Sequence, residues 1–273
     1  MNDNYIKNLI AETQQLVEKD NIIVKPENKI KKIISIASGK GGVGKTTLAV
    51  NFSLALSALN IKTTLLDVDL GLGDGDIIMG LSLKNTLIDF LTKKVDFKSI
   101  VNRYFDIDFI SAGSGISELA DLGDTEKNFI WNSIKSNLHT DVLFVDTGAG
   151  ISSNTTFFLK RSDFTIIIAT PEPTSFVDAY GAIKTMFARG YNNILVLINR
   201  AYDEEEALDI FSRMNRVSEK SLGKSLTYLG FIPEDKEYQY ALFKRKPVFF
   251  DKDSQARFYI EKVIGLLYND FIK

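Results

Sequence analysis

An alternation between short apolar runs and longer helical patterns constrains the fold of this chain more than any other feature. The runs are rich in β-branched residues and poor in charge, which is typical of strands buried on both faces. They span residues 33–38, 63–67, 107–111, 142–146, 164–169, 194–198 and 226–232, and helical patterns occupy 45–59, 126–138, 175–189 and 204–221. The alternation predicts an α/β fold with one doubly wound, mostly parallel sheet and helices on both faces.

Two segments of different character flank this alternation. Residues 5–19 have the spacing of a short amphipathic helix, and a polar stretch that contains Pro26 follows them. Residues 254–273 repeat apolar side chains at helical spacing. We therefore expect an N-terminal helix and linker over 1–32, the α/β domain over 33–250 and a C-terminal amphipathic helix over 251–273.

The composition excludes several kinds of chemistry. The 273 residues include no cysteine and one histidine, which removes thiolate metal sites, iron–sulfur clusters and Ser–His nucleophiles. Lys and Arg total 33 and Asp and Glu total 35, and the resulting net charge of −2 makes DNA an unexpected partner. No apolar run has membrane-spanning length and the N-terminus has no signal-peptide core, so we expect a cytoplasmic protein.

A glycine-rich loop follows the first apolar run and opens the first helical pattern. Gly39, Gly44, Lys45 and Thr46 satisfy the phosphate-loop pattern G-x-x-x-x-G-K-[ST]. Glycines let backbone N–H groups turn toward phosphate oxygens, and the helix N-terminus favours negative charge. We expect Lys45 to neutralise the β- and γ-phosphates and the Thr46 hydroxyl to ligate Mg²⁺. The predicted ATP contacts in this loop are Gly39, Lys40, Gly41, Gly42, Val43, Gly44, Lys45, Thr46 and Thr47.

Two other runs end in the carboxylates that a nucleotide–metal site requires. Asp67 and Asp69 are expected to project on one side of their strand, one toward Mg²⁺ and the other toward an attacking water. Asp146 is expected to hold Mg²⁺ through water, and the Gly148 N–H to sense the γ-phosphate. The glycine-rich stretch 71–76 lacks the glutamate of an EF-hand and is interpreted as a switch loop.

From residue 33 to about residue 247, these elements resemble the MinD/ParA family of deviant Walker A ATPases. The string Lys40-Gly-Gly-Val-Gly-Lys45-Thr-Thr contains the second lysine of that family. The resemblance implies an ATP-dependent homodimer in which Lys40 reaches the partner's nucleotide. It also implies that Asp69 orients water and that Asn199 and backbone near Pro233 contact adenine, although Asn199 is equally explained as a turn former. The resulting metal set is Thr46, Asp67, Asp69 and Asp146, and the catalytic set is Lys40, Lys45 and Asp69.

Within this family, two stretches are similar to the flagellar-number regulators of the FlhG group, also called FleN or YlxH. They are Asp146-Thr-Gly-Ala-Gly150 and Thr170-Pro-Glu-Pro-Thr-Ser-Phe-Val-Asp-Ala-Tyr180. The second is also explained as a strand exit with a helix N-cap at Thr174 or Ser175. The similarity implies a slow ATPase switch whose partners are an FlhF-type GTPase, flagellar switch (C-ring) proteins or a flagellar transcription regulator. Only Leu16 survives of the group's FlhF-stimulating motif.

Several alternatives remain open from the sequence. A MinD-like division-site ATPase, a ParA-like DNA partition ATPase and a nucleotide-binding scaffold with negligible turnover all fit the same motifs. The C-terminal helix has an apolar stripe with two explanations: docking on the inner face of the cell membrane when ATP is bound, as the resemblance implies, or packing on the domain. The stripe consists of Ile260, Val263, Ile264, Leu267 and Phe271.

Overall fold

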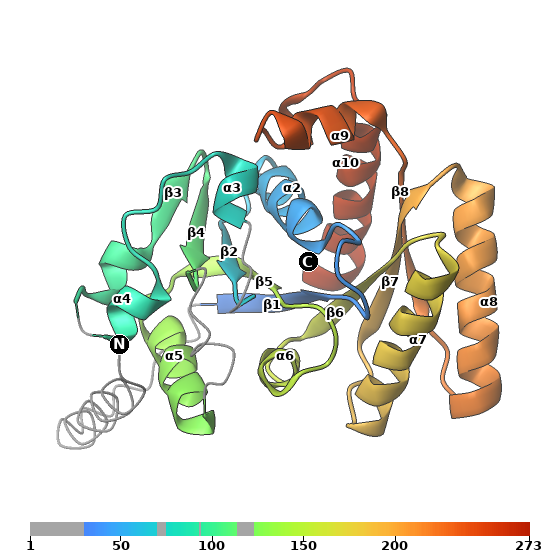
Figure 1. Cartoon of the computed structure of the whole chain (residues 1–273), viewed down its shortest axis with the longest axis horizontal. Coiled ribbons are helices and arrows are strands. Elements are labelled where there is room, and N and C mark those ends of the chain that lie inside the picture. The colour runs from blue at the N-terminus through green and yellow to red at the C-terminus, as the bar shows by residue number, and fades with distance from the viewer. Residues whose placement is uncertain (1–29, 70–74, 93, 114–122) are drawn as a thin grey trace.

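The computed structural model describes residues 30–69, 75–92, 94–113 and 123–273, and these form one eight-stranded sheet between two layers of helices (Figure 1). The strand order is β3-β4-β2-β5-β1-β6-β7-β8, and neighbours are parallel except for the antiparallel pair β3–β4. The strands are β1 (Ile30–Ala37), β2 (Thr63–Asp67), β3 (Asn102–Tyr104), β4 (Ile107–Ser111), β5 (Thr140–Asp146), β6 (Phe164–Ala169), β7 (Ile194–Ala201) and β8 (Thr227–Pro233). The predicted doubly wound sheet is confirmed.

Every predicted apolar run forms a strand of this sheet, with small shifts at the ends. β1 begins at Ile30 rather than at residue 33, so the end of the predicted linker belongs to the sheet. The edge strand β3 has the sequence Asn-Arg-Tyr, which contains no apolar run and was not predicted. The predicted helix over 5–19 and most of the predicted switch loop lie outside the described residues.

The helices cover both faces of the sheet. One layer consists of α2 (Lys45–Ser57), α3 (Gly75–Met79), α9 (Lys236–Phe243) and α10 (Gln255–Leu267). The other consists of α4 (Leu87–Leu91), α5 (Asp124–Asn137), α6 (Ser153–Leu159), α7 (Pro173–Ala188) and α8 (Glu204–Leu222) (Figure 1). Short 3-10 turns occur at Phe97–Ile100 and Val248–Phe250, and a π-helical turn at Tyr268–Ile272 follows α10.

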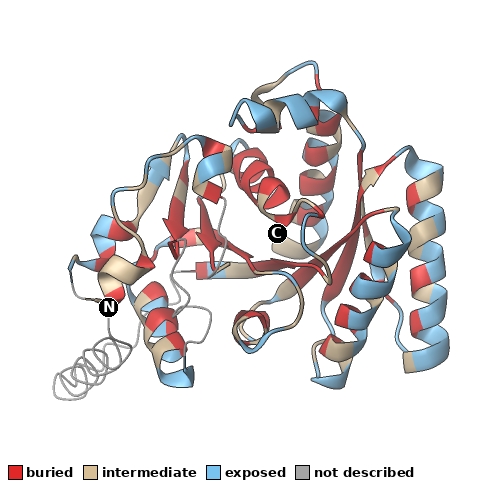
Figure 2. Cartoon of the chain, in the orientation of Figure 1, coloured by how far each residue is buried: buried red, intermediate tan, exposed pale blue. Residues whose placement is uncertain are grey.

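Side-chain alternation along the central strands explains why both faces need helices. Val142 and Phe144 of β5 belong to the core beneath α2 and α10, whereas Leu143 and Val145 belong to the core on the opposite face. All four are fully buried, and buried residues continue along the neighbouring strands (Figure 2). A strand that is apolar on both faces is stable only inside such a three-layer arrangement.

The acidic run before α8 shows how the sequence sets a helix boundary. Asp203 caps the helix because its Oδ1 accepts a hydrogen bond from the Glu206 N–H at 2.8 Å. Acidic residues fill the first turn, where the helix dipole favours negative charge, and Gly223 in the left-handed conformation (φ 62°) ends the helix. Residues 204–206 of this run therefore form the first turn of α8 and Asp203 is its cap.

The C-terminal helix α10 is part of the domain core. Ser254 caps its N-terminus, and Ile260, Val263, Ile264 and Leu267 are at most 1% exposed in the core cluster that α2 and β8 also form. Phe271 packs against Phe164, with ring centroids 5.3 Å apart. The sequence left two explanations of the apolar stripe, docking on the membrane and packing on the domain. In the structure the stripe packs on the domain. Within the described residues, no helix combines the length and apolarity needed to span a bilayer.

This packing predicts a difference between two truncations in α10. Ile260→Ala should lower the free energy of unfolding by about 2–4 kcal/mol because it leaves a cavity in the core. Leu266→Ala, at a side chain that is 43% exposed, should cost less than about 1 kcal/mol. Urea unfolding of both variants measures the difference, and equal small losses would show that α10 does not pack on the domain in solution.

Candidate functional site

The phosphate loop lies between β1 and α2, at the carboxyl edge of the sheet where open α/β folds bind ligands (Figure 1). Gly42 and Gly44 adopt left-handed conformations, with φ of 77° and 94°. Gly39 lies against α7 so closely that a Cβ would fall 2.0 Å from the carbonyl oxygen of Asp178. Gly42 and Gly44 are therefore required by the left-handed backbone, and Gly39 is required because a side chain there would collide with α7.

Lys45 is the buried lysine of the loop. It is 7% exposed, and no carboxylate of the described residues lies within ion-pair distance of its Nζ. A buried cation is costly without an anionic partner. At Gly41 and Gly42, by contrast, an added Cβ would meet nothing within 4 Å. A loop with a buried cation and exposed, uncrowded glycines leaves its backbone accessible to a phosphate group.

Two buried carboxylates end adjacent strands beside the loop. Asp67 of β2 and Asp146 of β5 are register partners and are 1% and 0% exposed. Asp67 Oδ1 accepts a hydrogen bond from the Asp69 N–H at 3.0 Å, and its Oδ2 accepts one from Gly75 at 3.3 Å. Burial raises the pKa of Asp67 well above its ordinary value, and the nearby charge of Asp146 adds to the rise. A divalent cation near both carboxylates would relieve this repulsion, so the pair fits the predicted Mg²⁺ site.

Asp69 lies two residues beyond the end of β2, so strand alternation does not by itself fix the direction of its side chain. Its charge contributes to the raised pKa of Asp67. The Asp69 carboxylate lies beside Gly148, where a Cβ would fall 3.3 Å from its Oδ1. The structure thus brings Asp69 next to the predicted γ-phosphate sensor.

Backbone hydrogen bonds join the loop after β5 to the phosphate loop. The Gly150 N–H donates to the Ser38 carbonyl at 2.9 Å. Thr147 donates to the Ile36 carbonyl twice, from its N–H at 3.2 Å and from its Oγ1 at 3.0 Å. A movement of the loop after β5 would therefore break or strain hydrogen bonds to β1 and to the start of the phosphate loop.

Asn199 supports the phosphate loop from β7. Its Nδ2 donates to the Val43 carbonyl at 2.7 Å, and the residue is fully buried. Its Oδ1 has no hydrogen-bond partner among the described residues. The strand β8 ends at Pro233, which is in register with Ala201. Asn199 lies within β7 and contacts the loop, so the turn-former explanation is wrong. The two predicted adenine contacts, Asn199 and Pro233, lie near the carboxyl ends of neighbouring strands.

Lys40 makes its contacts at the start of α7. Its Nζ donates to Glu172 Oε2 at 2.7 Å and to Thr174 Oγ1 at 3.0 Å. The hydrogen bond from Lys40 holds the pKa of Glu172 below its ordinary value. The alternative explanation of the stretch 170–180 places an N-cap at Thr174 or Ser175, but α7 begins at Pro173 with Glu172 as its N-cap. Sequence reasoning missed this role of Glu172 because 132 residues separate it from Lys40.

Comparison with protein families places this geometry among known folds. The ParA family model, described as NUBPL iron-transfer P-loop NTPase, matches residues 29–267. The name of that family model refers to iron transfer, but this sequence contains no cysteine and so has no thiolate ligands for an iron–sulfur cluster. The match covers every described strand of the sheet.

The chain is similar to proteins named for flagellar functions and to MinD proteins. The antiactivator FleN of Pseudomonas aeruginosa is 33% identical over 80% of this chain and 79% of FleN. The flagellum site-determining protein YlxH of Helicobacter pylori is 30% identical over 74% of this chain and 69% of YlxH. Among solved structures, MinD in the Aquifex aeolicus MinC:MinD complex superposes with a TM-score of 0.71 at 24% identity, covering 89% of this chain and 98% of MinD. Pyrococcus horikoshii MinD, solved with Mg-ADP, gives a TM-score of 0.69 at 22% identity over 85% and 94%.

The close approach of the loop to α7 predicts different results for two glycines. Gly39→Ala should lower the free energy of unfolding of the nucleotide-free protein by about 1–3 kcal/mol, because its Cβ collides with the α7 backbone. Gly41→Ala is the matched control and should change it by less than about 0.5 kcal/mol. Urea unfolding measures both. Equal stability of the two variants would contradict the described seating of the loop on α7.

Proposed function

Because the chain belongs to the ParA family of P-loop NTPases, which includes MinD and whose members are ATPases, we propose that it is an Mg²⁺-ATP-dependent dimerising switch that regulates flagellar number or placement. The observation that carries the ATPase switch is the pair of lysines in one loop. Lys45 is buried in the loop, whereas the side chain of Lys40 is 38% exposed and bound to residues at the start of α7. Such an exposed lysine can change partners when a second subunit arrives.

The residues of the site take the following roles in this proposal. Backbone N–H groups of residues 39–47 and the Lys45 ammonium bind the phosphates of ATP. Thr46, Asp67 and Asp146 hold Mg²⁺, which neutralises charge that develops on the phosphates. Asp69, beside Gly148, orients the attacking water. Asn199 and Pro233 border the adenine, and the unpartnered Asn199 Oδ1 is suited to accept a hydrogen bond from its amino group.

The flagellar role rests on similarity to FleN and YlxH, whose names refer to antiactivation and to flagellum site determination. On this basis the partners are an FlhF-type GTPase, flagellar C-ring proteins or a flagellar transcription regulator. A MinD-like role in division-site selection is the second candidate, supported by the fold-level likeness to MinD. Peripheral membrane association would require surfaces other than the buried stripe of α10, such as the exposed Phe258 and Leu266.

Substitutions of Lys40 and Asp69 should separate dimerisation from hydrolysis. Lys40→Ala should keep ADP binding but lose ATP-dependent dimers and about 10³-fold or more in turnover, because charge stabilisation from a partner subunit has that magnitude in related phosphoryl transfers. Asp69→Ala should form ATP dimers that persist. Light scattering after gel filtration and a phosphate-release assay measure the two properties.

The matched control for this test is Lys220→Ala, at an exposed lysine of α8. It should behave as the unmodified protein in both assays. Normal dimerisation and turnover in Lys40→Ala would overturn the proposed role of Lys40. Negligible phosphate release from the unmodified protein would favour a nucleotide-binding scaffold instead.

The pathway can be tested through the long-lived dimer. Asp69→Ala loaded with ATP should retain FlhF-type or flagellar switch proteins from lysate of the native host, identified by mass spectrometry. Lys40→Ala, which should remain monomeric, is the control. Recovery of division proteins would leave the ATPase proposal intact and overturn the flagellar role. An ATP-dependent, salt-sensitive shift of plasmid DNA would do the same.

A further inference from the structure

A hollow of about 570 Å³ runs along α6, away from the phosphate loop. One stripe of α6 lines it, with positions spaced as i, i+3, i+4 and i+7 on the helix surface: Ser153, Thr156, Phe157 and Lys160. Asn128 of α5, Arg161 and Arg189 line the remaining sides. Figure 1 shows α5, α6 and α7 on the same side of the sheet, with α6 between the other two. We refer to this space as the α6 hollow.

Three cations of the α6 hollow form no close ion pair with another described residue. No carboxylate of the described residues lies within ion-pair distance of Lys160, Arg161 or Arg189. Arg161 is fixed by neutral contacts: it donates to the Phe157 carbonyl at 2.9 Å, and its guanidinium lies 3.5 Å from the centroid of the Phe157 ring. Arg189 donates to Thr156 Oγ1. The two guanidinium groups are therefore positioned before any ligand arrives.

The acidic residue that lines the α6 hollow does not neutralise these cations. Asp124 is the only carboxylate among the described lining residues, and it lies 3.5 Å from Lys127 Nζ. Lys127 is buried, with a side chain 3% exposed, and also donates to Ser153 Oγ at 2.8 Å. The charge of Asp124 also acts on Arg161, but a single carboxylate lines the hollow beside Lys160, Arg161 and Arg189, so the described lining keeps an excess of positive charge in a chain whose net charge is −2.

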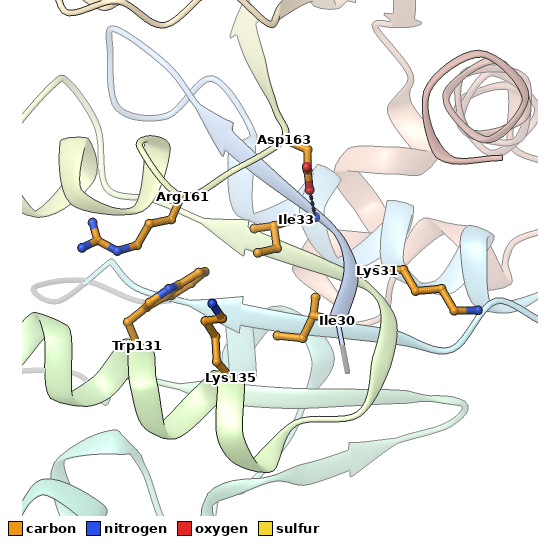
Figure 3. Close-up of a pocket in the computed structure, with 7 residues that line it drawn as sticks. All are labelled: Ile30, Lys31, Ile33, Trp131, Lys135, Arg161 and Asp163. Carbon is orange, nitrogen blue, oxygen red and sulfur yellow. Dashed lines mark hydrogen bonds between the residues drawn. The ribbon is translucent and has the colours of Figure 1, made fainter. Parts of the chain in front are cut away.

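A second hollow of about 320 Å³ adjoins the first through Arg161 (Figure 3). Trp131 and Lys135 of α5 border it, and Lys135 also has no acidic partner among the described residues. Asp163 on its rim accepts a hydrogen bond from the Ile33 N–H at 2.8 Å. Ile30 and Ile33 place this hollow at the start of β1, whereas the phosphate loop follows the end of that eight-residue strand. The two ends are about 25 Å apart at the usual rise per residue.

We propose that the α6 hollow is a second anion site, distinct from the nucleotide site, that binds a phosphate-bearing ligand. Guanidinium groups match phosphate oxygens through paired N–H donors, and the Lys160 ammonium adds a charge. The Ser153 hydroxyl and the side-chain N–H groups of Asn128 supply further donors, whereas the Thr156 hydroxyl already donates to the Ser152 carbonyl at 2.7 Å. A ligand in the α6 hollow would lie along α6. This helix begins three residues after Gly150, and the Gly150 N–H donates to the Ser38 carbonyl at the start of the phosphate loop.

The test uses inorganic pyrophosphate in Mg²⁺-free buffer with two forms of the full chain in which the phosphate loop does not compete. One is Lys45→Ala and the other is the unmodified protein saturated with ADP. Calorimetry gives the stoichiometry, and fluorescence reports the site because Trp131 is the sole tryptophan and its ring centroid lies 6.2 Å from that of Phe158 in α6. Both forms should bind one equivalent of pyrophosphate.

Two added variants assign the binding to the α6 hollow. Lys160→Ala combined with Arg189→Ala should weaken pyrophosphate binding by about 100-fold, at roughly tenfold for each charged contact. Lys220→Ala is the matched control and should leave the affinity unchanged. No binding by either form, or equal affinity in the double variant, would overturn the proposal. Tighter binding of a polyglutamate peptide than of pyrophosphate would overturn the assignment to phosphate and indicate an acidic protein segment.

Discussion

The nucleotide site depends on the contact between the phosphate loop and the elements that follow β6. The Gly39 backbone touches α7 at Asp178, and the Val43 carbonyl accepts a hydrogen bond from Asn199 of β7. β1 pairs with β5 on one side and β6 on the other, so these contacts tie the loop to the half of the sheet that does not carry the acidic strand ends. A nucleotide bound at the loop would therefore contact a segment that is tied to both halves of the doubly wound fold.

Buried charged groups gather at the carboxyl edge of the sheet. Asp67 and Asp146 lie side by side in adjacent strands, where burial disfavours their charged forms. The buried Lys45 ammonium supplies opposite charge in the loop that follows the next strand, β1. Groups whose burial is costly in isolation become favourable around a metal–phosphate complex, because each charge then has a partner. The same arrangement explains why apolar strands end in carboxylates at this one edge.

Local sequence patterns predicted the framework well. The phosphate loop is defined by glycine and lysine spacing, and buried parallel strands are defined by apolar runs, so both were visible without tertiary information. Asp67 and Asp146 followed from their positions at the ends of such runs. The C-terminal stripe was also visible, but a stripe of apolar residues does not say whether lipid or β8 will cover it.

The features that sequence did not predict depend on how the chain turns after an element or on distant contacts. Asp69 lies two residues beyond the end of β2, so strand alternation could not show that its carboxylate lies beside Gly148. The Lys40–Glu172 pair joins residues 132 positions apart. The cations of the α6 hollow come from separate helices and looked like ordinary surface charge in the sequence. That they line one hollow and form no close ion pair with a described residue became apparent only when the helices were placed together.

Nucleotide titration with and without Mg²⁺ tests most directly the central claim that the buried acidic edge and the phosphate loop form one site. Calorimetric titration of ATP should give one nucleotide per chain, and Mg²⁺ should strengthen binding by at least about tenfold, since the two buried carboxylates need a cation beside the phosphates. In Asp146→Asn the gain from Mg²⁺ should largely disappear. Nucleotide binding that is absent, or equally tight with and without Mg²⁺, would contradict the account.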